Sequence, residues 1–235
     1  MVIDVANLEF CWQPKAPMVL SIDALQVSPG ERLFIKGPSG SGKSTLLSLL
    51  SGVTTASAGT VRVMDRALEQ LSSVQRDHFR ADHIGFIFQM FNLIPYLSVV
   101  DNVMLPCRFS ARRRAKALSR GNGLKAEARR LLQHLDMDHP DLHQRAITTL
   151  SVGQQQRVAA ARALMGSPEL LIADEPTSSL DADRRESFIR LLFNECHESG
   201  ATLIFVSHDA SLQHLFDRPI NLTEINRLTQ DKVEI

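Results

Sequence analysis

The sequence lacks any arrangement of cysteines that could form a disulfide framework or a metal site. The 235 residues contain three cysteines, Cys11, Cys107 and Cys196, which are odd in number and far apart. Disulfide-rich domains and structural zinc sites need cysteines in even numbers or in closely spaced pairs. We therefore expect a protein of a reducing compartment, where these thiols stay reduced.

An excess of charge of either sign is also missing. The chain has 26 Lys and Arg residues against 26 Asp and Glu residues, so its formal net charge at pH 7 is +0. Proteins that attract nucleic acid through their overall charge are strongly basic. We expect no nucleic-acid partner.

No uninterrupted hydrophobic run is long enough to cross a membrane. The longest mostly apolar stretch, residues 84–100, is broken by Gln89, Asn92, Pro95 and Ser98, whereas a span needs roughly 20 predominantly apolar residues. The start of the chain has no basic segment followed by an apolar stretch, so a secretory signal is not expected. These features predict a soluble protein that reaches a membrane only through a partner.

The order of the hydrophobic segments indicates an α/β fold. Hydrophobic residues make up 44% of the chain, enough for a full core. Continuous apolar strands separated by helices are typical of a parallel sheet that is covered on both faces. We expect β-rich runs at residues 2–8 and 18–27, strands at residues 32–35, 170–173 and 202–206, and helices at residues 44–50, 155–164 and 184–198. Gly52 and Gly200 are expected to end helices, and residues 91–150 read as helical.

Residues 37–44 match the phosphate-binding pattern G-x-x-x-x-G-K-S, between a predicted strand and a predicted helix. The glycines allow successive backbone N–H groups to point at phosphate oxygens, and the helix N-terminus adds a positive field. A chance glycine-rich turn is the alternative, but it would not need both flanking elements. Lys43 is expected to reach the β- and γ-phosphates, and the Ser44 hydroxyl to bind Mg²⁺. The predicted nucleotide-binding residues of this segment are Gly37, Pro38, Ser39, Gly40, Ser41, Gly42, Lys43, Ser44 and Thr45.

Two acids, Asp174 and Glu175, follow the predicted strand at residues 170–173. Ligands of α/β folds bind outside the carboxyl ends of parallel strands. Asp174 is suited to hold Mg²⁺, and Glu175 could act as a general base on an attacking water. A pair of solvated acids at a strand end is the alternative, which the phosphate loop makes less favourable.

Residues 150–157 place Ser151 and Gly153 at the start of a helix. A serine there is ordinarily an N-cap, because its hydroxyl satisfies an unpaired backbone N–H group. The functional alternative is a second anion site. One chain would then have two phosphate-binding helix starts but a single Mg²⁺ site, so the second start would serve the nucleotide of another copy.

The segment Ser151, Val152, Gly153 and Gln154 resembles the signature loop of ATP-binding-cassette (ABC) ATPases, with Val152 where glycine is usual. The resemblance covers nearly the whole chain. Gln89 is similar to the glutamine that touches Mg²⁺ and the water. Residues 178–181 resemble the D-loop, whose Asp181 crosses the dimer, and His208 resembles the switch histidine at the γ-phosphate. Trp12 falls where the family stacks an aromatic ring on adenine, with Phe10 as its competitor.

This resemblance implies the fold, the cofactors and the mechanism. We expect one domain over residues 1–235: a P-loop NTPase core (residues 1–90 and 157–235) with a parallel-rich sheet and an N-terminal antiparallel β part, and an inserted helical subdomain (residues 91–156). ATP and Mg²⁺ are the expected cofactors. Two copies would meet head to tail around two ATP molecules, and separate after hydrolysis. The implied catalytic residues are Lys43, Gln89, Glu175 and His208, and the implied metal ligands are Ser44, Gln89 and Asp174.

Residues 84–106 are similar to bacterial ATPases of the macrolide-exporter, lipoprotein-releasing and cell-division type. The resemblance implies a permease partner with few membrane helices and a large extracytoplasmic domain, at the cytoplasmic face of the inner membrane, with a periplasmic adaptor as a further candidate. The alternatives are a conventional ABC importer or exporter, or a recruitment module switched by ATP. A nucleotide kinase would not need the signature loop. Cassette proteins of DNA repair or translation carry coiled coils or two cassettes, which this chain lacks.

A basic stretch at residues 108–130 contains nine Lys and Arg residues and one acid, Glu127. The simpler interpretation is a solvated helical face. The alternative is contact with anionic lipid headgroups or with an acidic permease loop.

Overall fold

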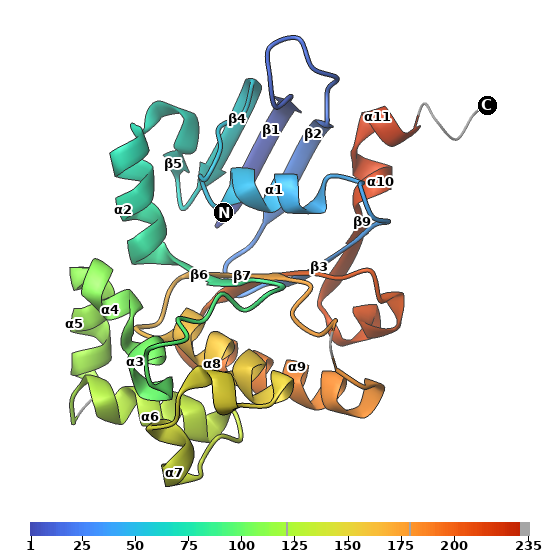
Figure 1. The fold of residues 1–235 in the computed structure, drawn as a ribbon. Coiled ribbons are helices and arrows are strands. Elements are labelled where there is room, and N and C mark those ends of the chain that lie inside the picture. Colours follow the sequence, from blue (N-terminus) through green and yellow to red (C-terminus); the bar gives the residue numbers. More distant parts are fainter. Residues whose placement is uncertain (121, 179, 231–235) are drawn as a thin grey trace. The chain divides into compact units, whose positions relative to one another are not determined.

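The computed structural model describes residues 1–120, 122–178 and 180–230, and the chain forms two compact units (Figure 1). The first comprises Met1–Arg80 and Thr202–Ile235, and the second comprises Ala81–Ala201. The helical subdomain predicted over residues 91–156 falls within the second unit, and its boundaries stay a prediction. None of the helices among the described residues combines the length and the apolar character that a bilayer span requires.

The first unit contains the antiparallel sheet expected near the N-terminus. Its order is β2-β1-β4-β5, with β1 at Ile3–Phe10, β2 at Leu20–Val27, β4 at Ala58–Val63 and β5 at Arg66–Ala67. In β1 the buried side chains change from odd positions (Ile3, Val5) to even positions (Leu8, Phe10). The pairing with β4 shifts its register between Ala6 and Glu9, and such a bulge moves the following side chains to the other face.

The parallel strands of the first unit come from both ends of the chain. β3 (Arg32–Lys36) pairs in parallel with β8 (Thr202–Val206) and with β9 (Arg218–Asn221). Phe34 and Phe205 are fully buried, and their ring centroids each lie 5.0 Å from that of Phe216. The remaining elements are α1 (Lys43–Leu50), the 3-10 helices η1 (Leu68–Gln70) and η3 (Ala210–Leu215), α10 (Leu222–Ile225) and α11 (Arg227–Gln230).

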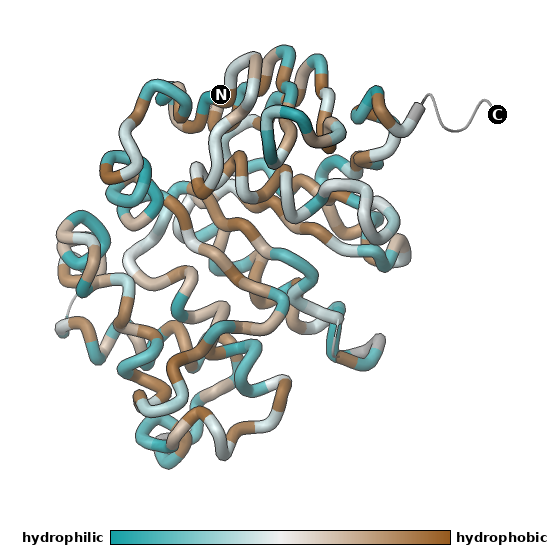
Figure 2. Tube along the Cα trace, turned by 45° about the horizontal axis from the view of Figure 1, so that its top comes forward, coloured by the Kyte–Doolittle hydropathy of each residue, from teal (hydrophilic) through white to brown (hydrophobic). Residues whose placement is uncertain are grey.

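The second unit is mostly helical around two parallel strands, β6 (Ile84–Ile87) and β7 (Leu170–Asp174). The strands β6 and β7 are mostly buried and apolar. Figure 2 shows many of the hydrophobic residues along inner segments of the tube, with hydrophilic residues frequent on outer turns. The helices are α3 (Val99–Met104), α4 (Pro106–Phe109), α5 (Ala111–Ser119), α6 (Leu124–His134), α7 (Pro140–His143), η2 (Ile147–Thr149), α8 (Val152–Leu164) and α9 (Ala182–Ser199), while α2 (Ser73–His83) runs across the boundary.

Most of the predicted elements are present, with two differences. The helices α8 and α9 begin two or three residues earlier than predicted, because Ser151 and Asp181 cap them. The prediction that helix begins near Phe91 is wrong for residues 91–98, which form a loop. Phe91 and Asn92 have positive φ angles there (59° and 49°), which no α-helix accommodates. The predicted helix ends are confirmed, since Gly52 and Gly200 have left-handed φ angles of 69° and 70° after α1 and α9.

Candidate nucleotide site

The phosphate loop connects β3 to α1 in the first unit, and two of its glycines, Gly42 and Gly37, have close neighbours that a Cβ atom would meet. Gly42 precedes α1 with a φ of 97°, and a Cβ atom there would lie 2.8 Å from Leu20 Cδ2. A Cβ atom on Gly37 would lie 2.7 Å from Ser41 Oγ. The N-cap residue Gly42 has no side chain to cap the start of α1, and an anion at such a helix start would be stabilised by the positive end of the helix dipole.

Lys43 is the first residue of α1, and its side chain turns back over the loop. Its Nζ atom donates to the carbonyl oxygens of Gly37 (2.8 Å) and Pro38 (3.0 Å), and the residue is only 7% exposed. The Ser41 hydroxyl is buried and has no hydrogen-bond partner among the described residues. A buried ammonium group, an unsatisfied buried hydroxyl and an uncapped helix start fit the triphosphate of a nucleotide.

His208 lies beside this loop in the same unit. The register of the parallel strands pairs Ile35 of β3 with Val206 of β8, so Gly37 and His208 each stand two residues beyond the same pair. His208 is exposed, and Ser207 Oγ accepts a hydrogen bond from the Asp209 N–H group (3.1 Å). The strand pairing therefore brings together a phosphate loop and a histidine that are far apart in the sequence.

The two aromatic candidates for adenine stacking differ in exposure. Trp12 is 58% exposed, whereas Phe10 is 5% exposed within β1. The rings meet edge to face, with centroids 5.0 Å apart. Of these two rings, Trp12 therefore has enough exposed surface to stack on a base, and the buried Phe10 ring packs against it.

In the second unit, the same register rule places Gln89 beside Glu175. Ile87 of β6 is paired with Ala173 of β7, and Gln89 and Glu175 each follow two residues later. Glu175 has a φ of 45°, an arrangement that costs a non-glycine residue roughly 1–2 kcal/mol. Such strain persists mostly at functional sites. Asp174 closes β7, and carboxylate and amide oxygens at this strand edge suit Mg²⁺.

The signature segment begins α8 with a complete capping box. Ser151 Oγ accepts from the Gln154 N–H group (3.3 Å), and Gln154 Oε1 accepts from the Ser151 N–H group (2.9 Å). Val152 is 49% exposed. A Cβ atom on Gly153 would contact only Leu180 Cδ2, at 3.6 Å, so nothing among the described residues of this chain requires a glycine there. The N-cap that the sequence predicts at Ser151 is therefore present. The second anion site at this helix start stays a prediction.

The D-loop aspartate also caps a helix. Asp181 accepts a hydrogen bond from the Arg184 N–H group (3.0 Å) at the start of α9. Ser179 lies outside the described residues. A cavity of ≈ 270 Å³ adjoins the signature segment, and the Gln156 amide, buried beside it, has no hydrogen-bond partner among the described residues. The lining residues include Ser151, Gly153, Gln154, Gln156, Leu180 and Arg184.

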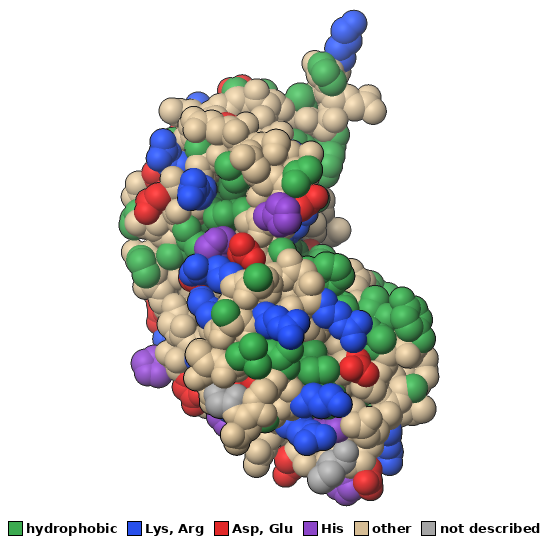
Figure 3. All heavy atoms as spheres, turned by 90° about the vertical axis from the view of Figure 1, so that its left-hand side faces the viewer, with side chains coloured by type: hydrophobic (Ala, Val, Ile, Leu, Met, Phe, Trp, Pro, Cys, Tyr) green, Lys and Arg blue, Asp and Glu red, His purple; other side chains and the backbone are tan. Residues whose placement is uncertain are grey.

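Part of the basic stretch at residues 108–130 is neutralised by acids within the second unit. Figure 3 shows the face that carries α5, where Lys and Arg side chains gather. Arg112 and Lys116 lie 2.5 Å and 2.7 Å from Glu169. Burial alone raises the pKa of the Glu169 carboxyl, but hydrogen bonds from His83, Arg112 and Lys116 outweigh burial and hold that pKa well below its usual range. The exposed members, with no ion pair among the described residues, are Arg108, Arg114, Lys125 and Arg129.

Arg113 of this stretch is part of the core. It is 3% exposed and donates to the carbonyl oxygens of Ile84 (3.3 Å), Ala163 (2.6 Å) and Met165 (2.7 Å). Burial lowers the pKa of its guanidinium to about 10. The sequence indicated a surface charge here, and only the fold shows that this arginine binds backbone.

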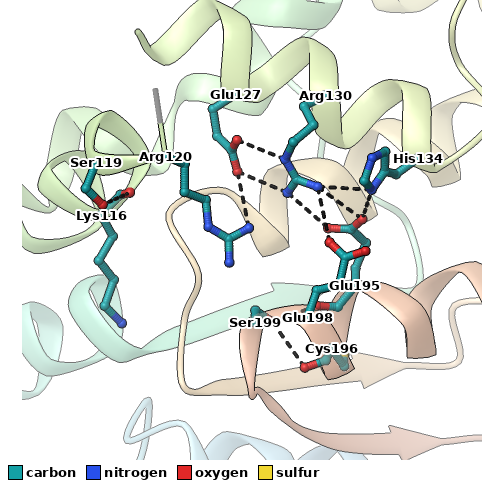
Figure 4. Close-up of polar contacts among 10 residues, drawn as sticks. All are labelled: Lys116, Ser119, Arg120, Glu127, Arg130, His134, Glu195, Cys196, Glu198 and Ser199. Carbon is teal, nitrogen blue, oxygen red and sulfur yellow. Dashed lines mark hydrogen bonds and ion pairs between the residues drawn. The ribbon is translucent and has the colours of Figure 1, made fainter. Parts of the chain in front are cut away.

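Arg130 is the centre of the ion-pair network in Figure 4. It binds Glu127 at 2.9 Å and Glu195 at 3.2 Å. By residue type, His134, Glu195 and Glu198 could hold a metal, since their ligand atoms lie within 4.8 Å of one another. Arg130 Nη1, however, lies 3.0 Å, 3.4 Å and 3.6 Å from these three side chains. The guanidinium group therefore occupies the place that a metal cation would take.

Comparison with known proteins agrees with this geometry. A family profile described as "ABC transporter" matches residues 20–178. The uncharacterized ABC transporter ATP-binding protein YbbA of Escherichia coli strain K12 is 42% identical over 198 residues, 84% of this chain and 83% of YbbA. The lipoprotein-releasing system ATP-binding protein LolD of Syntrophotalea carbinolica is 38% identical over 225 residues, 94% of this chain and 95% of LolD. The post-hydrolysis dimer of the ATP-binding cassette MJ0796, bound to ADP and Pi, matches with a TM-score of 0.80 at 32% identity, covering 93% of both chains.

The chain belongs to the ABC transporter family, as an ATP-binding subunit. It is an ATPase that uses ATP and Mg²⁺, and its predicted α/β class is confirmed by the match to MJ0796. Sequence reasoning missed Arg162, a buried arginine of α8 that donates to the carbonyl oxygens of Phe91 and Asn92. Its position in an alanine-rich helix could have indicated burial, but nothing in the sequence pointed to these partners.

Proposed function

We propose that this chain is the ATP-hydrolysing subunit of a bacterial transporter complex, which dimerises on ATP and drives a permease of the force-transmitting, lipoprotein-releasing or macrolide-exporting type. The phosphate loop with the inward-turned Lys43 supports the nucleotide chemistry. Similarity to LolD over 94% of the chain supports the type of complex. The permease would have few membrane helices and a large extracytoplasmic domain, with a periplasmic adaptor as a candidate, and the chain would lie at the cytoplasmic face of the inner membrane.

The catalytic residues would act mainly by orienting and neutralising charge. Lys43 would bind the β- and γ-phosphate oxygens, and Ser44, Gln89 and Asp174 would hold Mg²⁺, which neutralises charge on the phosphates. Glu175 would accept a proton from the attacking water, and His208 would bind the γ-phosphate. Trp12 would stack on adenine. Phosphoryl transfer needs little covalent participation by the protein, so precise orientation of these groups supplies most of the rate.

The signature segment would bind the nucleotide of a second copy. Gly153 supports this proposal, because the nearest atom to an added Cβ among the described residues is 3.6 Å away. A glycine that the described part of its own chain does not need would be explained by the approach of a phosphate from a partner. The capping box uses the N–H groups of Ser151 and Gln154, and those of Val152 and Gly153, at the same helix start, would bind such a phosphate. Asp181, which caps α9, would contact the same partner.

Glu175→Gln tests the hydrolytic role. We expect the variant to bind ATP and to form a stable ATP-dependent dimer, with kcat lowered about 10²–10⁴-fold, the range typical of a general base. Dimer formation is measured by size-exclusion chromatography, and turnover by phosphate release. Glu198→Gln, at a side chain that is 51% exposed and outside the proposed machinery, is the matched control and should behave as wild type. Near-normal turnover in Glu175→Gln would reject Glu175 as the base.

The type of permease is tested by affinity purification from membranes. We expect a co-purifying integral membrane protein with few helices and a large extracytoplasmic domain. Co-purification of a many-helix importer permease would contradict the proposed type of permease, but it would not contradict the ATPase activity. Full cellular function of Glu175→Gln would favour the recruitment module, in which ATP-driven dimerisation matters and turnover does not.

A further inference from the structure

Arg162 joins the last turn of α8 to the loop that follows Gln89, within the second unit. The residue is 9% exposed. Its Nη1 atom donates to the carbonyl oxygen of Asn92 (2.6 Å), and its Nη2 atom donates to that of Phe91 (2.5 Å). A guanidinium group presents two parallel donors in a rigid plane, so it fixes both carbonyls at once.

The loop whose carbonyl groups Arg162 binds has an unfavourable backbone conformation. Phe91 and Asn92 are consecutive non-glycine residues with φ angles of 59° and 49°. Such residues persist only where the surrounding structure determines them. Local hydrogen bonds from Phe91 N to Phe88 O (2.9 Å) and from Asn92 N to Met90 O (2.6 Å) close the turn, and the Arg162 contact ties it to the helix.

Gln89 lies between two fixed points of backbone. β6 ends at Ile87, which is fully buried, and the Arg162 contact begins at Phe91. The Gln89 side chain is exposed, and Met90 is 81% exposed. The position of Gln89 is therefore set by the backbone on either side rather than by packing of its own side chain.

The other end of α8 is the signature segment. Arg162 lies eleven positions after Ser151 along the capped helix, which is about 16 Å at 1.5 Å per residue. Ala159, Ala160, Ala161 and Ala163 of α8 are at most 3% exposed, so this helix is packed closely and should move as one piece.

We propose that Arg162 is a positioning residue, which fixes the position of Gln89 relative to α8. A displacement of the signature segment is then transmitted to Gln89 through the rigid helix and the two backbone carbonyl groups that Arg162 binds. The inference rests on the proposed function, in that Gln89 is the residue through which Arg162 affects turnover. Arg162 itself does not touch the nucleotide.

The test compares Arg162→Lys with Arg113→Lys in the full chain. Lysine keeps the charge but cannot donate to two carbonyls in a plane. Because misplacing a reacting group by about 1 Å can cost on the order of 100-fold, we expect Arg162→Lys to lower kcat roughly 10–100-fold, with the KM for ATP within about threefold. Arg113 is equally a buried, carbonyl-binding arginine, but it contacts Ile84, Ala163 and Met165 and not the loop. Arg113→Lys should therefore lower the Tm, but its kcat should equal that of wild type when measured at a temperature below that Tm.

A double-mutant cycle with Gln89→Ala separates positioning from general destabilisation. If Arg162 acts through Gln89, Arg162→Lys should lower kcat less than about twofold further once Gln89 is alanine. Losses that multiply in the double variant, or an unchanged kcat in Arg162→Lys alone, would overturn the inference. Normal turnover in Gln89→Ala alone is a different result: it would reject the role of Gln89 in the proposed function, and the inference with it.

Asn92→Pro disturbs the same contact from the side of the loop, and it replaces Arg162→Lys as the test variant if that variant does not fold. Proline fixes φ near −65°, which is incompatible with the 49° of Asn92. We expect the same fall in kcat, again absent when Gln89 is alanine. A wild-type kcat in Asn92→Pro would overturn the inference.

Discussion

The Lys43 ammonium group and the Gly37 carbonyl oxygen are 2.8 Å apart, across the phosphate loop that separates them in sequence. The contact holds the side chain over the loop, where it remains 7% exposed. The charge is thus already placed for a phosphate, so little side-chain entropy has to be lost when ATP binds.

Lys43→Ala should therefore weaken ATP binding strongly. Loss of a hydrogen bond to a charged group costs about 1.5–3 kcal/mol, which is roughly 10–150-fold in Kd. Equilibrium binding of a fluorescent ATP analogue measures the change. Lys36→Ala is the control, since Lys36 ends β3 and donates to Gln213 (3.1 Å) outside the loop. Equal affinity in Lys43→Ala and wild type would contradict the assignment.

Trp12 is the chain's single tryptophan, so if it stacks on adenine as proposed, its fluorescence will report on nucleotide binding directly. We expect ATP to quench it and Trp12→Ala to weaken ATP binding by about 1–3 kcal/mol, the usual value of one base stacked on an aromatic ring. Trp12→Phe should retain most of the affinity. If Phe10→Leu, at the buried neighbour, lowers affinity more than Trp12→Ala, the stacking role belongs to Phe10.

Glu169 should make stability depend on pH. Its pKa is held below the usual range in the folded protein, because the hydrogen bonds from His83, Arg112 and Lys116 outweigh the effect of burial. Its contribution is therefore complete above the unfolded pKa, near 4.3, and is lost as the pH falls toward the folded pKa. Glu169→Gln should lower the free energy of unfolding at pH 7 by about 1–2 kcal/mol after solvent screening.

Urea denaturation at pH 7 and at pH 3.5 measures this dependence. The difference in the free energy of unfolding between wild type and Glu169→Gln should be smaller at pH 3.5 than at pH 7. Glu198→Gln, at a more exposed side chain, should change little at either value. A difference that grows as the pH falls would have the wrong sign for a depressed pKa and would refute the prediction.

Gly85 in β6 has no room for a side chain. A Cβ atom there would lie 2.3 Å from the Ala163 carbonyl oxygen, and both groups are parts of packed backbone. Gly85→Ala should destabilise the protein by about 1–3 kcal/mol, the range for overpacking a core. Thermal unfolding measures the loss of stability. In Gly30→Ala the added Cβ would meet no atom of the described residues within 4 Å, but the φ of 74° is unfavourable for alanine, so this variant measures backbone strain without a clash. Equal Tm values for Gly85→Ala and wild type would show that α8 can move away.

Most of the local elements, and the pattern that predicts a phosphate site, could be read from the sequence alone. Residues 37–44 identified a phosphate loop because glycine, lysine and serine at that spacing have few other uses. The strands at residues 32–35, 170–173 and 202–206 were evident because a fully buried strand must be continuously apolar. Helix ends at Gly52 and Gly200 followed from the left-handed conformation that glycine tolerates.

Which of these groups lie next to one another depends on the strand pairing, which the sequence did not predict. The strand registers that pair Ile35 with Val206 and Ile87 with Ala173 place His208 beside the phosphate loop and Gln89 beside Glu175. Likewise, a run of arginines in the sequence does not distinguish an exposed Arg114 from an Arg113 buried against three carbonyl oxygens. The reason is that side-chain pattern reports burial and periodicity, whereas a long-range hydrogen bond depends on which backbone another segment brings within about 3 Å.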